Sequence, residues 1–309
     1  MLIDAVITWV DGADPAHAAR RAFHARGSNP RPEAVASTRF TSSGELRFTV
    51  RSLLRFLPSV RRIHVVTDDQ HPHPIAAELA EHPTRVAVVP HRTIFAEHAD
   101  LLPVFSSRSI ETMIHRIPDL AERFLYLNDD IFIGRPMTEA DFFDGDVPVL
   151  RGTMRRFPNP VMQRLRKAFD WERPGYGAAQ RAAARLVGRR RDYLLLEHQP
   201  SPMCRSTLAT FYAGDQDALR RQAGHRFRSV EQVSPIGLSA HLELAAGAPI
   251  APPVDVGYVR PGRPSGEALR RVMSRLQEDA FASFCVQSLD AMSTADRDVV
   301  LRGLEERYT

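Results

Sequence analysis

Short apolar runs rich in β-branched residues recur through the first half of the chain. They predict strands at residues 2–10, 62–67, 85–90 and 123–127. Between the first two runs, apolar residues return at the three- and four-residue spacing of a helix over residues 45–57, until Pro58 ends the pattern. The hydrophobic period therefore changes from that of a strand to that of a helix and back.

The same helical spacing predicts further helices along the chain, at residues 74–82, 110–117, 265–278 and 294–307. Strands and helices that alternate in this way are typical of a parallel sheet covered by helices. We therefore predict an α/β fold with a mostly parallel, Rossmann-like sheet flanked by helices.

Polar residues follow each of these predicted strands. They are Asp11, Asp68, Asp69 and His91, and the run Asn128, Asp129 and Asp130. In an open parallel sheet, ligands bind at the carboxyl ends of the strands. We therefore expect several of these side chains to meet along one edge of the sheet.

The adjacent carboxylates Asp129 and Asp130 stand between two apolar runs, 123–127 and 131–133. Burying two such charges is costly unless something neutralises them. Hard oxygen ligands at a strand end suit Mg²⁺ or Mn²⁺, and a bound diphosphate would supply further oxygens. The alternative is a turn or a helix cap, in which Asn and Asp bond to nearby backbone groups.

Other polar residues near the strand ends are ambiguous by themselves. Trp9 is either a core residue or a neighbour of a nucleotide base. Asp11 and Gly12 form a dipeptide that is common in turns, and Asp68 lies in a segment with the same ambiguity.

Candidates also occur in the second half of the chain. His198 stands between two proline-containing stretches and is either a structural residue or a general acid or base, because histidine titrates near neutrality. Arg226 and Arg228 are two residues apart. In a strand both would face one side and could clamp a phosphate, and the alternative is two surface arginines.

Composition narrows the classes of function. The formal net charge is +4, and Lys167 is the one lysine among the basic residues. Arginine can grip phosphates in a bidentate way, although so small a net charge also fits an ordinary surface. The signatures of nicotinamide enzymes, P-loop hydrolases, serine esterases and zinc sites are missing from the sequence. No nucleic-acid partner is expected.

The apolar runs and the cysteines of the sequence predict where in the cell the protein is located. No run of about 20 apolar residues occurs, so no transmembrane helix is expected. The first residues, with Asp4, fit a strand better than a signal peptide. Cys204 and Cys285 permit one disulfide, but a reduced protein is the better expectation. We expect a cytoplasmic protein, either free or at the inner face of the membrane.

Residues 155–191 are strongly basic, with ten Arg and one Lys. They predict amphipathic helices broken near Pro174 and Gly175. The segment is either a solvated surface, a site that binds an anionic acceptor, or a surface that contacts the membrane. We divide the chain into a nucleotide-sugar and metal-binding core at 1–154, a basic helical segment at 155–195, and a part that completes the same site at 196–309.

Taken together, these segments resemble the Stealth family of bacterial capsular polysaccharide phosphotransferases, which are similar to the catalytic subunit of GlcNAc-1-phosphotransferase. The matching segments are 3–15, 44–72, 102–134, 198–208 and 225–229, with a weaker match at 284–290. Two departures stand out. Ser42 and Ser43 replace Asp or Asn before the second block, and Gln287 and Ser288 stand where the fourth block has Asn-Asp.

The resemblance implies transfer of hexose 1-phosphate from a nucleotide sugar, with a UDP-sugar favoured, to a glycan hydroxyl during surface-polymer synthesis. Asp129 and Asp130 would hold Mg²⁺ or Mn²⁺. His198 would take the acceptor proton, and Asp11 and Arg228 are the other catalytic candidates. The donor would be bound by Trp9, Asp11, Gly12, Arg47, Arg51, Asp68, Asn128, Arg226 and Arg228.

Two alternatives stay open at this point. A metal-dependent glycosyltransferase on the same fold would release nucleoside diphosphate instead of monophosphate. A non-catalytic relative would only bind glycan or anionic membrane through its basic segment. Peripheral contact with the membrane or with other polysaccharide-synthesis proteins is compatible with any of these functions.

Overall fold

The central sheet has five strands, and its middle strand is the first strand of the chain. The computed structural model describes residues 2–28, 30–159 and 175–309. The strand order is β10 (Ser201–Cys204), β4 (Arg123–Asn128), β1 (Ile3–Thr8), β2 (Val60–Thr67) and β3 (Val86–Pro90). Neighbours from β4 to β3 are parallel, and only the edge strand β10 is antiparallel to its partner. The predicted strands and the mostly parallel sheet are confirmed.

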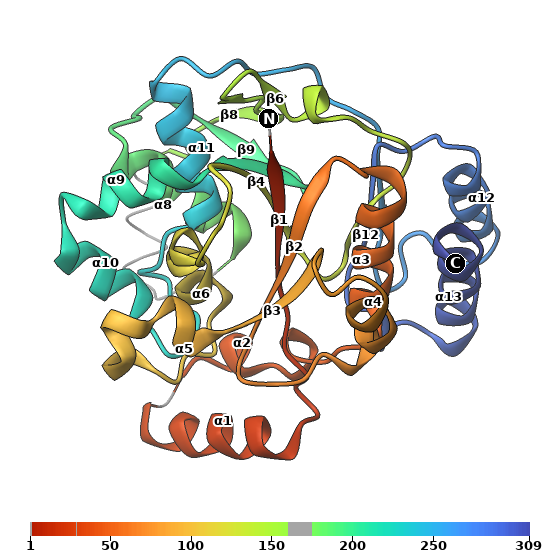
Figure 1. The fold of residues 1–309 in the computed structure, drawn as a ribbon, viewed down its shortest axis with the longest axis horizontal. Coiled ribbons are helices and arrows are strands. Elements are labelled where there is room, and N and C mark those ends of the chain that lie inside the picture. The colour runs from red at the N-terminus through yellow and green to blue at the C-terminus, as the bar shows by residue number, and fades with distance from the viewer. Residues whose placement is uncertain (1, 29, 160–174) are drawn as a thin grey trace.

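Helices cover both faces of this sheet (Figure 1). One side carries α3 (Glu45–Phe56), α4 (Ala76–Glu81), α12 (Gly266–Gln277) and α13 (Thr294–Tyr308). The other carries α5 (His91–Ile94), α6 (Ser107–Met113), α8 (Tyr176–Leu186), α9 (Arg205–Ala213), α10 (Gln216–Ala223) and α11 (Pro235–Ala245). Helices α1 (Pro15–Ser28) and α2 (Pro32–Val35) follow β1. The predicted helices at 45–57, 265–278 and 294–307 are confirmed.

The alternation of side chains along β1 explains the two layers. Ile3, Ala5 and Ile7 pack into one hydrophobic core with α3 and α13, whereas Val6 packs into the other core with α6. Successive strand residues point to opposite faces, so a strand covered on both faces is apolar at most positions. This requirement produces the apolar run by which β1 is visible in the sequence, interrupted only by Asp4, which is buried and paired with Arg61.

A smaller sheet joins the two halves of the chain beside the first one. Its order is β11 (Val256–Val259), β12 (Ser283–Val286) and β5 (Ile131–Ile133). Strand β5 follows β4 after the Asp129–Asp130 turn, so the two carboxylates lie where the chain passes from one sheet to the other. Two-stranded ribbons pair β6 (Phe143–Asp144) with β7 (Val147–Pro148), and β8 (Gly152–Arg156) with β9 (Asp192–Leu196).

The predicted helices of the basic segment are only partly correct. Arg155 and Arg156 lie in β8, where pairing with β9 overrides the helical pattern, so a helix there was wrong. The basic helix expected from about residue 176 is present as α8. The intervening residues 160–174, with Lys167, lie outside the described residues.

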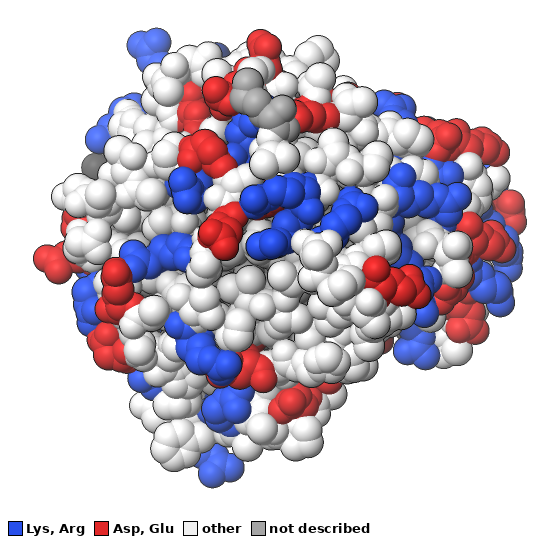
Figure 2. Space-filling view, in the orientation of Figure 1, with Lys and Arg blue, Asp and Glu red and all other residues white. Residues whose placement is uncertain are grey.

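Charge is spread over the surface. On the face in Figure 2, basic side chains gather in several groups with acidic side chains beside them. None of the helices in the described part of the chain is long and apolar enough to span a membrane. Cys204 and Cys285 are buried free thiols.

One buried ion cluster ties the amino ends of the central strands together. Asp4 is fully buried, accepts hydrogen bonds from Arg61 and from the Ala121 N–H, and contacts His64 at 3.2 Å. Burial alone would raise the pKa of Asp4, but these hydrogen bonds lower the pKa well below its usual range.

Replacing Asp4 should therefore destabilise the fold. We expect Asp4→Ala to lower the free energy of unfolding at pH 7 by roughly 2–4 kcal/mol, because Arg61 and a buried N–H lose their partner. A group with a lowered folded-state pKa stabilises above its unfolded-state pKa, so the difference from wild type should shrink as pH falls below about 4. Urea unfolding at pH 7 and pH 3 measures both effects.

The exposed Asp298 in α13 provides the control. Asp298→Ala should change the stability by less than about 0.5 kcal/mol. An equal decrease in the free energy of unfolding in the two variants would show that the Asp4 cluster does not stabilise the fold more than a surface residue does.

Candidate active site

A cavity of about 620 Å³ opens at the carboxyl ends of β1 and β4. Residues from segments far apart in the sequence line it, including six of the residues singled out above: Trp9, Asn128, Asp129, Asp130, His198 and Arg228. Of the polar residues expected at this edge of the sheet, those that follow β4 line the cavity, whereas Asp11 after β1 does not.

Three hydrogen bonds fix the turn that carries the two carboxylates. Thr49 Oγ1 on α3 donates to the Asp129 carbonyl at 2.6 Å. The Val286 N–H at the end of β12 donates to the Asp130 carbonyl at 3.0 Å, and the Ile133 N–H donates to Ser52 Oγ at 2.9 Å. The turn and the strand that follows it are thereby held by α3 and by the second sheet.

The carboxylates form an acidic wall of the cavity together with Glu45. Glu45 is buried at the first turn of α3. Burial, Asp130 and Glu45 raise the pKa of Asp129 well above its usual value. Burial and Glu45 raise the pKa of Asp130 to about 7, and burial raises the pKa of Glu45 as well. Each shift has the same cause, which is that neighbouring negative charges share a desolvated site.

This acidic wall fits a divalent cation. Asp130 Oδ1 is buried and has no hydrogen-bond partner, as expected of an oxygen that awaits a ligand. Among residues 2–28, 30–159 and 175–309, however, no three His, Cys, Asp or Glu side chains form a complete metal-binding group. A cation held by Asp129 and Asp130 would therefore take its other oxygen ligands from substrate or water.

Three arginines form a basic wall of the same cavity. Arg39 ends the short helix η1 (Ser37–Arg39), Arg108 lies in α6, and Arg228 lies in the loop after α10. Burial, followed by repulsion from Arg228, lowers the pKa of Arg108 and of Arg39 to about 10. Burial also lowers the pKa of Arg228. An anionic ligand would relieve this repulsion.

Tyr126 and Glu111 contribute the polar groups that lie close to both walls. The Tyr126 hydroxyl lies 3.0 Å from Asn128 Oδ1 and 3.2 Å from Glu111 Oε1 and donates its one proton to one or the other. Burial raises the pKa of Glu111, while Arg228 and Arg108 oppose that shift. Glu111 therefore balances part of the positive charge of the basic wall.

His198 is held between two aromatic rings. Its ring centroid lies 4.7 Å from that of Tyr176 and 5.4 Å from that of Tyr258. Burial lowers the pKa of His198, and Glu197 opposes the shift. The Tyr258 hydroxyl also donates to Gln287, a residue of the altered fourth block that lines the cavity. A neutral imidazole is thus the favoured form at neutral pH.

Several predicted donor-binding residues do not line this cavity. Arg47 pairs with Glu305 and Arg51 with Glu78, because both arginines point from α3 toward α13 and α4. Arg226 contacts His24 instead of lying beside Arg228. Its segment is a loop and not a strand, so residues two apart need not face the same side.

Other predicted residues have structural contacts. Asp68 pairs with Arg20 at 2.8 Å and lies 3.8 Å from His17 and from His91. Asp11 caps its own turn by accepting the Ala13 N–H. A Cβ on Gly12 would lie 2.4 Å from the Phe40 carbonyl oxygen, so this glycine permits close backbone packing.

The interpretation of the sequence missed Glu45, Glu111, Arg39 and Arg108. One signal was available for the α6 pair, because Arg108 and Glu111 stand among small and apolar residues of a segment with helical spacing, and the structure shows both charged side chains buried. Charged residues are rarely buried without a partner. No comparable signal marks Arg39.

Two family models match parts of the chain. Residues 1–24 match the family model of Stealth protein conserved region 1, and residues 39–149 match that of conserved region 2. The chain therefore carries the first two conserved regions of the Stealth proteins, and the resemblance drawn from the sequence is confirmed. Both matched regions contribute residues to the cavity.

Two relatives illustrate the similarity. The chain is 36% identical to the exopolysaccharide phosphotransferase SCO6021 of Streptomyces coelicolor over 299 residues, which cover 95% of this chain and 52% of that protein. It is 34% identical to the exopolysaccharide phosphotransferase CpsY of Mycobacterium leprae, over 75% of this chain and 41% of that protein. The chain thus spans about half the length of these relatives, or less.

Solved structures with a similar fold are glycosyltransferases. The galactosyltransferase LgtC, in complex with donor and acceptor sugar analogues, matches with a TM-score of 0.47 and 12% identity over 99% of this chain and 96% of that chain. Mouse xyloside xylosyltransferase 1 matches with a TM-score of 0.42 and 11% identity over 92% of this chain and 97% of that chain. These likenesses are too distant to bear on function.

The acidic wall predicts a reversed pH effect on stability. A carboxylate with a raised folded-state pKa loses stabilisation as pH rises from its unfolded-state pKa to its folded-state pKa. Without metal, Asp130→Asn should therefore raise the free energy of unfolding at pH 8 by roughly 1–3 kcal/mol and change it little at pH 4. Thermal unfolding in EDTA at both pH values measures this.

Added Mg²⁺ provides the complementary measurement. It should raise the melting temperature of the wild type at pH 8 and have a much smaller effect on Asp130→Asn. If Asp130→Asn destabilises the metal-free protein at pH 8, the Asp130 carboxylate stabilises the fold more through its other contacts than it destabilises the fold through charge repulsion.

Proposed function

We propose that the chain transfers a sugar 1-phosphate from a nucleotide sugar, with a UDP-sugar favoured, to a hydroxyl of a glycan acceptor. The product is a phosphodiester in a surface polysaccharide, and nucleoside monophosphate leaves. The observation that carries the proposal is the single cavity in which a carboxylate pair, three arginines and His198 all take part. The names of the relatives support it.

The charge distribution suits attack at phosphorus. In such a reaction negative charge lies on the nonbridging phosphate oxygens, and catalysis comes mainly from positioning and electrostatic stabilisation. Arg108 and Arg228 are held in the cavity wall and would bind those oxygens. Arg39 adds a third positive charge at the same wall. Of the clamp first expected from Arg47, Arg226 and Arg228, the basic wall keeps Arg228 and adds Arg39 and Arg108.

Asp129 and Asp130 would hold Mg²⁺ or Mn²⁺ beside the donor diphosphate. When bound, such a cation neutralises diphosphate charge and that of the leaving group. Glu45 strengthens the negative field that attracts it. Trp9 and Asn128 line the cavity next to this turn and would contact the donor.

His198 is proposed as the general base. The acceptor O–H gives its proton to the imidazole while the oxygen bonds to phosphorus. The bond from phosphorus to the leaving phosphate oxygen breaks, and the electron pair leaves with the nucleoside monophosphate. Burial lowers the pKa of His198 and so favours the neutral imidazole that can accept the proton, and contact with the tilted ring of Tyr176 limits the orientations of the imidazole.

One assay separates this reaction from its main rival. The purified chain is incubated with Mg²⁺, a panel of UDP-sugars and oligosaccharide acceptors, and the released nucleotide is identified. We expect UMP, whereas a glycosyltransferase would release UDP. EDTA should abolish the release. Full activity in EDTA would remove the metal from the mechanism, and binding without turnover of any donor would favour a non-catalytic relative.

His198→Ala should lower kcat by about 10²–10⁴-fold, the usual contribution of a general base, with little change in donor KM. The wild-type rate should fall with decreasing pH as the imidazole becomes protonated, at a pKa below the usual value for histidine. Steady-state kinetics from pH 5 to 8 measure both effects.

The partly exposed His82, at the end of α4, provides the control. His82→Ala should leave kcat and the pH profile unchanged. A kcat for His198→Ala within a factor of about three of the wild-type value would exclude the general-base role.

A further inference from the structure

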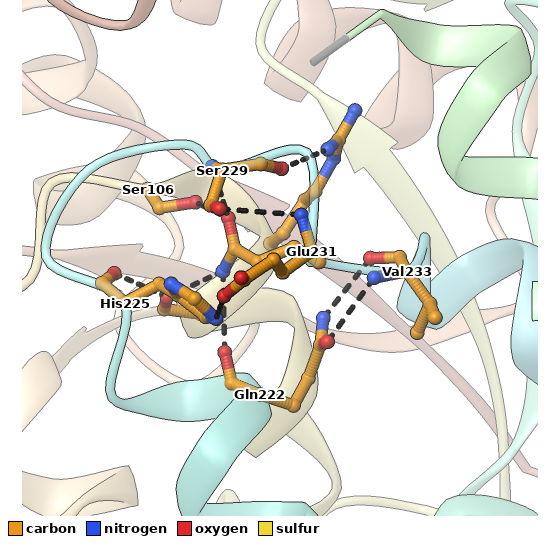
Figure 3. Close-up of polar contacts among 9 residues, drawn as sticks. Ser106, Gln222, His225, Ser229, Glu231 and Val233 are labelled. Carbon is orange, nitrogen blue, oxygen red and sulfur yellow. Dashed lines mark hydrogen bonds and ion pairs between the residues drawn. The ribbon is translucent and has the colours of Figure 1, made fainter. Parts of the chain in front are cut away.

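The loop that carries Arg228 has no regular secondary structure, yet its position is fixed. Residues 225–233 connect α10 to α11 and run along the start of α6. The Phe105 N–H donates to the Arg226 carbonyl at 2.6 Å, and Ser109 Oγ donates to the His225 carbonyl at 2.7 Å. Figure 3 shows the polar contacts that join this loop to the helix and to Gln222.

Gln232 is the centre of these contacts and is fully buried. Its Oε1 accepts from Ser106 Oγ at 2.8 Å and from the Ser229 N–H at 3.1 Å. Its Nε2 donates to Ser109 Oγ at 2.9 Å and to the Gln222 carbonyl at 3.1 Å. All four hydrogen-bonding positions of the amide are therefore used, which is the arrangement that a buried amide needs in order not to cost stability.

The serines that bond to Gln232 lie next to two arginines of the basic wall, Arg108 and Arg228. Ser106 and Ser109 flank Arg108 in the chain, and Ser229 follows Arg228. The arginines also join the two segments directly, because Arg228 Nη2 donates to Ser107 Oγ at 2.7 Å and Arg108 Nη1 donates to the Ser229 carbonyl at 3.2 Å. Gln232 itself does not line the cavity, whereas Ser107, Arg108 and Arg228 do.

Holding Arg108 and Arg228 together opposes their repulsion. Two guanidinium groups in a desolvated wall tend to separate, and their low-dielectric surroundings strengthen that tendency. The loop has no helix or sheet hydrogen bonds to resist it, so the side-chain network must do so. Gln222 supports the far end of the loop, with its Nε2 donating to the Val233 carbonyl at 3.0 Å and its Oε1 accepting the Val233 N–H at 3.1 Å.

We propose that Gln232 is a positioning residue that holds Arg108 and Arg228 at the spacing needed to bind a phosphate group. The inference rests on the proposed function, in which these arginines bind the donor phosphates. Gln232 acts without touching the ligand, through the segments 106–109 and 228–229.

Inorganic pyrophosphate with Mg²⁺ is the probe, because it tests the phosphate site without a choice of sugar or base. We expect Gln232→Leu and Arg228→Ala each to weaken its binding roughly 10- to 100-fold, the value of one or two charge-assisted hydrogen bonds. The double variant should lose less affinity than the sum of the two single losses, since Gln232 acts in part through Arg228. Titration calorimetry measures all three affinities.

A second, smaller substitution tests the network in case Gln232→Leu does not fold. Ser109→Ala removes one hydroxyl from the network and should weaken pyrophosphate binding by a smaller factor, about two- to tenfold, with native circular dichroism. Gln277 provides the matched control. It lies at the end of α12, donates to the Gly303 carbonyl at 2.8 Å and is remote from the cavity lining. Gln277→Leu should leave pyrophosphate affinity unchanged.

The outcomes separate the two proposals. If Arg228→Ala binds pyrophosphate as the wild type does, the phosphate role of the basic wall fails. If Arg228→Ala is weakened but Gln232→Leu and Ser109→Ala are not, only the positioning role fails. Losses of Gln232→Leu and Arg228→Ala that add in the double variant would likewise overturn it, because independent effects add.

Discussion

Repulsion between like charges in a shared, desolvated cavity is the constraint on which the rest of this site depends. On one wall, burial, Asp130 and Glu45 raise the pKa of Asp129, and burial and Glu45 raise that of Asp130. On the other wall, burial and repulsion from Arg228 lower the pKa of Arg39 and of Arg108. Neither wall is at its most stable when empty. A ligand that brings positive charge to the first wall and negative charge to the second would relieve both, and a metal-bound diphosphate has that charge pattern.

The scaffold is built to resist this repulsion. The carboxylate turn is held by Thr49 on α3 and by Val286 on the second sheet. The arginine loop is held by Ser106 and Ser109 at the start of α6, both of which contact Gln232. In each case a short segment without its own regular hydrogen bonds is fixed by partners far away in the sequence. Such preorganisation keeps charged groups in place before the substrate arrives, so little reorganisation is needed during the reaction.

The fold could be predicted well because its strands are buried on both faces. Continuous apolar runs marked β1, β2, β3 and β4, and the amphipathic spacing marked α3, α12 and α13. The helical prediction at Arg155 and Arg156 failed because those residues pair with β9, a long-range contact that local pattern does not record. The edge strand β10 and the strands β11 and β12 were also outside what periodicity could reveal, whereas β5 coincides with the apolar run 131–133.

By itself the sequence determined which reactive side chains were available, and it placed the two carboxylates at the end of a strand. Asp129 and Asp130 follow a buried strand, and the ends of parallel strands form a ligand site whatever else surrounds them. Only the tertiary structure decided which arginines join them. Arg47, Arg51 and Arg226 have the same chemistry as Arg39, Arg108 and Arg228, but ion pairs and a neighbouring histidine hold them elsewhere. The partner that each arginine finds depends on the packing of segments distant in the chain, and spacing along the sequence does not carry that information.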